Sequence, residues 1–257
     1  MSPLGRPRVH LARTGSTNDV ARSLALAGAP HGTLVTAGEQ TAGRGRHGRA
    51  WTAPAGSSLL MSLLLRDPPS LLPLIAAVAL CDAAGPQARI KWPNDIVVAR
   101  AGDGGHGLAK LAGILVEARL QAGWAVLGVG VNVAVRIEDL PPELRPSGQG
   151  PDARSALPAA TLGRRPAEVE ALLALLLAAL ERRLAQPAQV TLEAWRARDA
   201  LLGRRITWGS DHGERPAAHG TAHGVDGTGR LVVELDWGGR LTLGAGEVHL
   251  LDVGEPD

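Results

Sequence analysis

The chain has 257 residues, 45% of them hydrophobic, which is enough for one large core or for one large and one small core. Its formal net charge of +2 excludes a general attraction to nucleic acid or to a membrane surface. A single cysteine, Cys81, excludes an internal disulfide, and the longest apolar runs are too short to span a bilayer, so we expect a cytoplasmic protein.

The first predicted element is a helix that follows the segment Gly15-Ser-Thr-Asn-Asp19. Apolar residues recur after this segment at helical spacing, and Ser16 with Asp19 has the spacing of a capping box. Such polar residues are typical helix caps, but the start of a helix can also bind a ligand. Both interpretations stay open at this point.

A short strand over 33–37 leads into a glycine-rich loop that carries Arg44, Arg46 and Arg49. Three guanidinium groups this close repel one another, so the loop is favoured when it surrounds an anion, and glycines let backbone N–H groups approach that anion. One interpretation is a flexible arginine-glycine segment that binds nucleic-acid phosphates. The other is an ordered nucleotide-phosphate loop of an enzyme.

The elements that follow suggest a sheet with helices. They are predicted as a strand over 58–66, a buried helix over 70–84, strands over 96–99, 110–120 and 124–135, a long loop over 136–165, and helices over 166–184 and 191–202. A Gly-rich connection over 100–109 is expected to be mobile, and Gln121-Ala-Gly123 is a hairpin signal. Consecutive strands with short turns predict an α+β domain, a mixed or antiparallel sheet with helices on one side.

The texture of the sequence changes after Gly203. From residue 204 to 253, short β-like runs alternate with Gly-rich turns at the spacing of a small barrel. The change predicts two domains, 1–203 and 204–257.

Scarce residue types mark the segments with chemical character. Of the 27 Lys and Arg side chains, only Lys91 and Lys110 are lysines, and Asn18, Asn94 and Asn132 are the only asparagines. A GC-rich coding bias would explain the scarcity, because lysine and asparagine have A/T-rich codons. Under such a bias, an exposed lysine can usually be replaced by arginine without harm. A lysine that remains is expected where a compact point charge is required.

Lys91 and Asp95 lie four residues apart around Pro93, and Lys110 opens a later strand. Each taken alone predicts a strand-end charge or a local ion pair that stabilises little. Together with the arginine loop, they supply cations for phosphate and a carboxylate for Mg²⁺. Gly128-Val-Gly130 predicts close backbone approach, either to another strand or to a ligand.

Five segments in this order resemble the biotin protein ligases: Gly15-Ser-Thr-Asn18, Glu39 to Trp51, Lys91-Trp-Pro-Asn-Asp95, Lys110 to Leu115, and Gly128 to Asn132. The resemblance covers residues from about 10 to 253. It implies a mixed sheet with helices, like the class II synthetase and biotin/lipoate ligase catalytic domain, followed by a small SH3-like β-barrel. Only about fifteen residues precede Ser16, so we expect a short form without the N-terminal DNA-binding domain of bifunctional members.

The resemblance also implies a two-step reaction. Biotin and MgATP give biotinyl-5′-AMP and pyrophosphate, and the biotinyl group then passes to one lysine of a biotin carboxyl carrier protein. No DNA or membrane partner is expected, and pairing of sheet edges would give a homodimer.

The family roles carry over to the matching positions of this chain. The biotin-binding residues implied are Ser16, Thr17, Asn18, Gln40, Gly43, Arg44, Gly45, Arg46, Lys110 and Gly113. Those for ATP or the adenylate are Arg46, Arg49, Trp51, Lys91, Asn94, Lys110 and Asn132. The catalytic residues implied are Arg44, Arg46, Lys110 and Asp95, with Asp95 also the candidate for Mg²⁺.

Three alternatives remain beside the ligase. A lipoate or octanoyl ligase would share the fold, but the complete arginine loop and Lys-Trp-Pro-Asn-Asp favour biotin. A nucleic-acid-binding module would use the arginine loop and show salt-sensitive binding, yet it leaves Asn18, Asp95 and Lys110 unexplained. A biotin-binding protein without activity would need a disabled site, and the sequence shows none.

Overall fold

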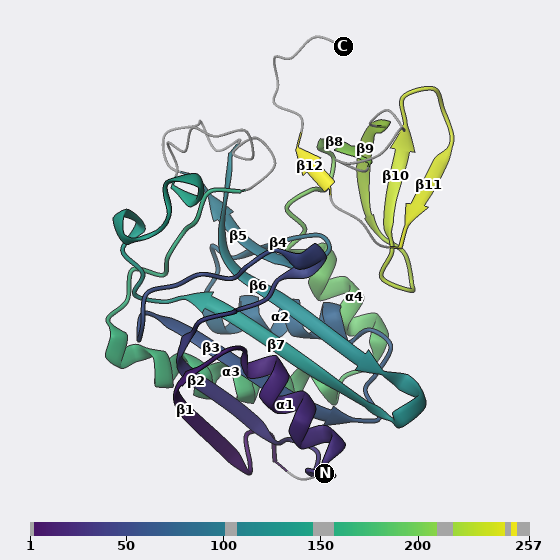
Figure 1. Ribbon diagram of the computed structural model, residues 1–257. Helices are drawn as coiled ribbons and strands as arrows, with labels where there is room; N and C mark the ends of the chain where they lie inside the picture. Colours follow the sequence, from purple (N-terminus) through teal and green to yellow (C-terminus); the bar gives the residue numbers. More distant parts are fainter. Residues whose placement is uncertain (1–2, 101–106, 146–156, 210–217, 245–247, 251–257) are drawn as a thin grey trace.

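The computed structural model describes residues 3–100, 107–145, 157–209, 218–244 and 248–250 (Figure 1). Its larger part is a seven-stranded sheet with the order β1-β2-β3-β7-β6-β5-β4. The strands are β1 (Arg8–Thr14), β2 (Leu34–Gln40), β3 (Ser58–Arg66), β4 (Arg89–Lys91), β5 (Asp95–Ala99), β6 (Leu108–Arg119) and β7 (Trp124–Asn132). Only β1 and β2 pair in parallel, so the predicted mixed sheet is confirmed.

Helices cover both faces of this sheet (Figure 1). The helices are α1 (Thr17–Leu26), α2 (Leu72–Ala84), α3 (Val169–Leu184) and α4 (Ala188–Arg196). Residues of α2, α3 and α4 share one large apolar cluster with the sheet, whereas Ala21 and Ala25 of α1 belong to a second cluster with Leu64 and Val126. The expectation of helices on one side is therefore wrong for α1, which shares its face with the candidate site.

Helix α2 forms the centre of the core. Nearly all of its residues are buried, because it is apolar around its whole circumference and lies between the sheet and helices α3 and α4. Pro73 lies in its first turn, where a missing N–H is tolerated, and so does not interrupt the helix. Cys81 is fully buried, and burial raises the pKa of its thiol to about 12.

Three local expectations differ from the structure. Strand β1 is not predicted, because its alternation of charged and apolar residues is weak and its partner β2 starts 20 residues later at Leu34. The capping box is wrong: Ser16 occupies the N-cap position without a side-chain capping bond. Helix α4 ends at Arg196, not Leu202, because the following residues pair with β4.

The segment after α4 extends the sheet beyond β4. The Ile90 N–H donates to Arg198 O at 2.8 Å, and the Ala200 N–H donates to Ile90 O at 2.9 Å. Asp199 lies between these two bonds, and burial raises the pKa of its carboxyl to about 6. The outer edge of β4 is thus covered by chain that the sequence predicts as helix.

The C-terminal part forms a second sheet with the order β11-β10-β9-β8-β12, antiparallel throughout (Figure 1). Its strands are β8 (Arg205–Trp208), β9 (Ala218–Val225), β10 (Leu231–Leu235), β11 (Arg240–Leu243) and β12 (Val248–Leu250). The architecture agrees with the expected SH3-like domain, although the strands that are described form an open sheet and no closed barrel. Ile206 and Val233 join the large apolar cluster of the first sheet.

Two connections fall largely outside the described residues: 101–106 within the Gly-rich segment and 146–156 within the long loop. The hairpin at Gln121 to Gly123 is present, with Gly123 in the left-handed conformation at φ 68°. Within the ranges described, no helix combines the length and the apolar character that crossing a membrane requires.

Candidate active site

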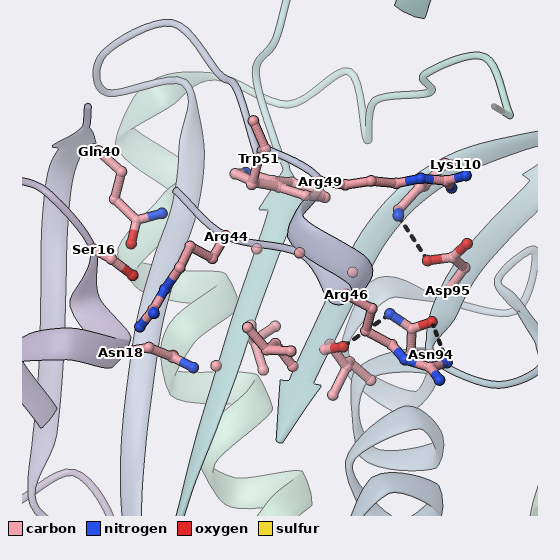
Figure 2. Close-up of a pocket in the computed structure, with 18 of the residues that line it drawn as sticks. Ser16, Asn18, Gln40, Arg44, Arg46, Arg49, Trp51, Asn94, Asp95 and Lys110 are labelled. Carbon is pink, nitrogen blue, oxygen red and sulfur yellow. Dashed lines mark hydrogen bonds and ion pairs between the residues drawn. The ribbon is translucent and has the colours of Figure 1, made fainter. Parts of the chain in front are cut away.

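A pocket lies on the face of the sheet that carries α1, between that helix, the arginine loop and strands β5, β6 and β7 (Figure 2). Figure 2 shows polar side chains at both of its ends, with Ser16, Asn18 and Gln40 at one end and Asn94, Asp95 and Lys110 at the other. Segments more than 90 residues apart in sequence therefore meet in one cavity.

The arginine loop is an ordered hairpin. The Trp51 N–H donates to Gly43 O at 2.9 Å, and the Gly45 N–H donates to Arg49 O at 2.7 Å. Its tip turns through His47 and Gly48, both with positive φ, at 53° and 75°. This order favours the interpretation of a nucleotide-phosphate loop over that of a flexible arginine-glycine segment.

Three glycines of the sheet make room for side chains of the site. A Cβ on Gly130 would lie 2.6 Å from Trp51 Cε2, and one on Gly113 would lie 3.2 Å from Trp51 Cζ3. A Cβ on Gly128 would lie 2.9 Å from Asn18 Cγ. The close approach expected at Gly128 and Gly130 is thus to side chains that line the pocket.

One end of the pocket is a hydrogen-bonded polar network. Gln40 Oε1 accepts from the Thr17 backbone N–H at 2.7 Å and lies 3.0 Å from the Thr17 hydroxyl. The Asn18 amide donates to Glu117 Oε2 at 2.7 Å, and Asn18 Oδ1 accepts from Ser62 Oγ at 2.6 Å. These contacts fix the orientation of the polar groups at the start of α1.

Ion pairs join the arginine loop to α1 beside this network. Arg44 lies 2.5 Å from Asp19, and Arg22 lies 2.6 Å from the same carboxylate oxygen. Asp19 is therefore used by two guanidinium groups, which explains why it does not serve in the expected capping box with Ser16.

The other end of the pocket is cationic. Among the described residues that line the pocket here, the cations are Arg46, Arg49, Lys91 and Lys110, and Asp95 is the carboxylate. Lys110 Nζ lies 2.7 Å from Asp95 Oδ1, and Arg46 Nη1 lies 3.5 Å from Asn94 Oδ1. Excess positive charge at this end favours an anionic ligand.

Lys91 links this end of the pocket to the second sheet. Its Nζ is buried and donates to Val248 O of β12 at 2.6 Å. His249, the next residue of β12, lines the pocket and is the one contribution of the described C-terminal strands to its wall.

Trp51 separates the main pocket from a smaller, more apolar cavity. The indole lies against the sheet with Lys110 Nζ 5.8 Å from its ring centroid, and its buried Nε1 has no hydrogen-bond partner among the described residues. The smaller cavity lies between Trp51, Lys110, Asn132 and apolar residues that include Leu140. Asn132 Nδ2 donates to Ala160 O at 2.9 Å, which leaves its amide oxygen for other contacts.

The structure brings nearly all of the sequence-predicted site residues into the main pocket. Those that line it are Ser16, Thr17, Asn18, Gln40, Arg44, Gly45, Arg46, Arg49, Trp51, Lys91, Asn94, Asp95, Lys110 and Gly113. Gly43 lies outside, where a Cβ would come within 2.5 Å of Trp51 O, so it shapes the hairpin. Asn132 lines the smaller cavity and not the main pocket.

Sequence reasoning did not find Ser62, Glu117 or His249. Ser62 is a polar residue inside the apolar strand β3, and its burial is the signal that could have identified it. Glu117 follows Gly113 and Leu115 on the same face of β6, so period-2 alternation would have placed it beside the site. His249 lies in β12 of the second sheet, and no local pattern places it here.

The described residues contain no cluster of three or more His, Cys, Asp or Glu side chains that could hold a metal ion alone. Asp95 and the amide oxygen of Asn94 are the oxygen donors at the cationic end. Such a set fits Mg²⁺, which is commonly held by one or two carboxylates together with substrate phosphates and water.

Comparison with known proteins gives consistent matches. A model of the biotin/lipoate A/B protein ligase family matches residues 10–133. The biotin–[acetyl-CoA-carboxylase] ligase of Mycobacterium tuberculosis is 37% identical over 259 residues, which cover 93% of this chain and 88% of that protein. The protein of the same name from Paracoccus denitrificans is 36% identical over 268 residues, which cover 93% of this chain and 98% of that protein.

Among solved structures, biotin protein ligase from Aquifex aeolicus in complex with biotin and ATP is similar with a TM-score of 0.69. The match covers 96% of this chain and 99% of that chain at 21% identity, so it bears on the fold alone.

Proposed function

The chain belongs to the biotin/lipoate A/B protein ligase family, among its biotin protein ligases, and on that premise we propose that it attaches biotin to a lysine of a carrier protein with consumption of ATP. The observation that carries the proposal is the polarity of the pocket. One end is a neutral hydrogen-bonding network, the other is cationic, and Lys110 lies where a carboxylate and a phosphate would meet.

The neutral end would bind the ring system of biotin. Ser16, Thr17, Asn18 and Gln40 supply hydrogen-bonding groups there, and Gly113 leaves room over β6 for the Trp51 indole. The arginine hairpin, with Arg44, Gly45 and Arg46 on the pocket wall, would cover the ligand. The acyl chain of biotin would then run along the sheet toward Lys110.

The cationic end would bind the ATP phosphates. In the first step a biotin carboxylate oxygen attacks the α-phosphorus, and the bond from that phosphorus to the bridging oxygen of pyrophosphate breaks. Two anions must approach each other, so the charges of Lys110, Arg46 and Arg49 lower the barrier by stabilising the developing negative charge.

Asp95 pairs with Lys110, in an ion pair that is not aligned as a hydrogen bond. A phosphate that takes up Lys110 would leave Asp95 for a cation. Asp95 and Asn94 would then hold Mg²⁺, which supplies charge neutralisation for the polyphosphate. In the second step the neutral amine of the carrier lysine would attack the acyl carbon, the bond from that carbon to the AMP oxygen would break, and the proton lost by the nitrogen would pass to water.

Trp51 and Asn132 would bind the adenine. The Trp51 indole and leucine side chains line the smaller cavity, and such a lining suits the faces of a flat base. The buried Trp51 Nε1 lacks an acceptor in the described part of the chain, and a buried donor is normally satisfied. A bound nucleotide would provide that acceptor.

The rest of the proposal concerns the assembly. Residues 1–203 would form the catalytic domain and 204–257 a smaller domain, with a biotin carboxyl carrier protein as partner in the cytoplasm. Strand β1 pairs only with β2 in the described sheet, so a homodimer by edge pairing would use β1.

Pyrophosphate release with ATP, magnesium and biotin tests the function. Release that depends on biotin and not on lipoate is the expected result. Pyrophosphate release with lipoate alone would support the adenylation chemistry but would identify lipoate, not biotin, as the substrate. Tight biotin binding without pyrophosphate release would indicate a biotin-binding protein that is not an enzyme. The absence of both biotin binding and pyrophosphate release would refute the ligase.

A further inference from the structure

Glu117 is a carboxylate at the biotin end of the pocket that the proposed reaction does not use. It extends from β6 into the space beneath the arginine hairpin, which is lined by residues 42–50 together with Leu115. Its side chain is 31% exposed, so it is neither a core residue nor a freely solvated surface charge. Its hydrogen bond is to Asn18, which is only 4% exposed.

The contact with Glu117 determines which way the Asn18 amide points. An ionised carboxylate can only accept, so the atom 2.7 Å from Glu117 Oε2 must be the amide nitrogen of Asn18. The Asn18 oxygen then accepts from the Ser62 hydroxyl at 2.6 Å, above the bare backbone of Gly128. Within the described chain, the second N–H of Asn18 has no protein acceptor.

The same polarity continues along the network. The Ser62 hydroxyl lies 2.6 Å from Asn18 Oδ1 and 2.8 Å from the Thr17 hydroxyl, and the Thr17 hydroxyl donates to Gln40 Oε1 at 3.0 Å. Gln40 turns its oxygen toward Thr17, and its amide nitrogen remains for the pocket. Acceptors therefore face the protein, while amide donors of Asn18 and Gln40 remain for a ligand.

Two cations hold Glu117 in this position. Arg44 lies 3.7 Å from Oε2, and Arg22 lies 3.8 Å from Oε1. Both also pair with Asp19, so α1, β6 and the hairpin share one ion network. Single exposed pairs stabilise little, but a network of four charges fixes the side chain that it surrounds.

We propose that Glu117 is a positioning residue for the ring of biotin: it orients Asn18 so that an N–H group, not an amide oxygen, faces the ureido carbonyl. The inference rests on the proposed function, since the carbonyl belongs to the proposed substrate. It makes Glu117 partly responsible for the selectivity for biotin over lipoate, because the dithiolane ring of lipoate has no carbonyl that could accept a hydrogen bond from Asn18.

Biotin binding to the intact protein, measured by isothermal titration calorimetry, tests the inference. Glu117→Ala should raise the Kd for biotin on the order of tenfold, the effect of losing one oriented hydrogen bond, and leave the KM for ATP unchanged. Glu117→Gln can still accept from Asn18 and should raise the Kd by no more than about threefold. Glu170→Gln on α3, which breaks the exposed pair with Arg8 of β1, is the matched control and should bind like wild type.

The double variant Asn18→Asp with Glu117→Gln separates orientation from stability. The introduced glutamine amide would donate to the introduced aspartate, and that aspartate would still accept from Ser62, so thermal stability should recover relative to Asn18→Asp alone. The group facing the biotin carbonyl would now be an acceptor, so biotin affinity should stay at least about tenfold below wild type.

The outcomes are distinguishable. Failure of the wild type and of Glu170→Gln to bind biotin would refute the proposed function itself. Normal binding by wild type with an unchanged Kd in Glu117→Ala would overturn the positioning role. Recovery of both stability and biotin affinity in the double variant would also overturn it, because a purely structural contact predicts that result.

Discussion

The two ends of the pocket are built on different principles. At the biotin end, Asn18, Ser62, Thr17 and Gln40 form one hydrogen-bonded network, and the nearby carboxylates of Asp19 and Glu117 both pair with Arg44. At the ATP end, the wall carries several cations against the single carboxylate of Asp95, and the Trp51 N–H is buried without an acceptor among the described residues.

The difference indicates what each end must do. A neutral ring gains affinity from groups that are already oriented, because binding then costs little additional ordering. A polyphosphate supplies its own negative charge, which offsets the excess of cations at the end that receives it. We therefore expect substitutions at the first end to act on biotin affinity, and those at the second to act on the chemical step.

Lys110→Ala should have the largest effect, since it removes the cation at the junction of the two ends. We expect adenylate formation to slow by roughly 10²–10³-fold, as when one charge-stabilising group is removed from a preorganised site. Biotin-dependent pyrophosphate release measures it. Arg119→Ala, an exposed cation at the far end of the same strand, is the control and should leave the rate unchanged. Equal rates in the two variants would contradict the role of Lys110.

Arg46→Gly should affect retention of the intermediate. Without this side chain beside Asn94, the hairpin should hold biotinyl-5′-AMP less well and release it on the order of tenfold faster, the factor that about 1.4 kcal/mol of lost contact gives. Free adenylate in the filtrate of a reaction without carrier protein is the measurement. His47→Gly is the control. It adds a glycine to the same turn, at a residue that already has φ 53°, and should not release more free adenylate than wild type.

Two glycines on one strand can separate the ends directly. Gly130→Ala should displace Trp51 and raise the KM for ATP by about tenfold, since its Cβ would lie 2.6 Å from the indole. Gly128→Ala should displace Asn18 and raise the Kd for biotin by a similar factor, with little effect on ATP. Identical profiles for the two variants would show that the ends are not independent.

Asp199→Asn should have the smallest effect on catalysis and a measurable one on stability. The pKa of Asp199 is about 6 in the folded chain and 3.8 for the ordinary carboxyl, so the folded state binds the proton more tightly. Its contribution to stability is present below pH 3.8 and is lost as pH rises through about 6.

The asparagine variant should therefore gain on the order of 2 kcal/mol relative to wild type at about pH 7.5 and little at about pH 4. Thermal unfolding at the two pH values gives the comparison. A gain of the same size at both values would show that ionisation of Asp199 is not its cause. Unaltered pyrophosphate release would confirm that β4 still presents Lys91 to the ATP end.

The motifs that the sequence revealed are those in which chemistry is concentrated in a few adjacent residues. The arginine loop and the Lys-Trp-Pro-Asn-Asp segment carry unusual combinations of Gly, Pro and charge, so their roles could be inferred before any packing was known. The mixed sheet and its strands β3, β6 and β7 followed from long apolar runs.

The elements that were missed depend on partners far away in the sequence. Asp19 has the sequence spacing of a capping box with Ser16, but its carboxylate pairs with Arg22 and Arg44 instead. Residues 198–200 have helical composition, yet they form backbone hydrogen bonds with the edge of β4. Glu117 gained its significance only when α1 and the hairpin were placed over β6.

The burial of Cys81 makes the protein well suited to site-directed labelling. The lone thiol lies in the central helix, fully shielded, and its pKa of about 12 leaves almost no thiolate at neutral pH. A cysteine introduced at the tip of the arginine hairpin would thus be the single reactive one, and a fluorophore attached there could report the motion of the hairpin during one turnover.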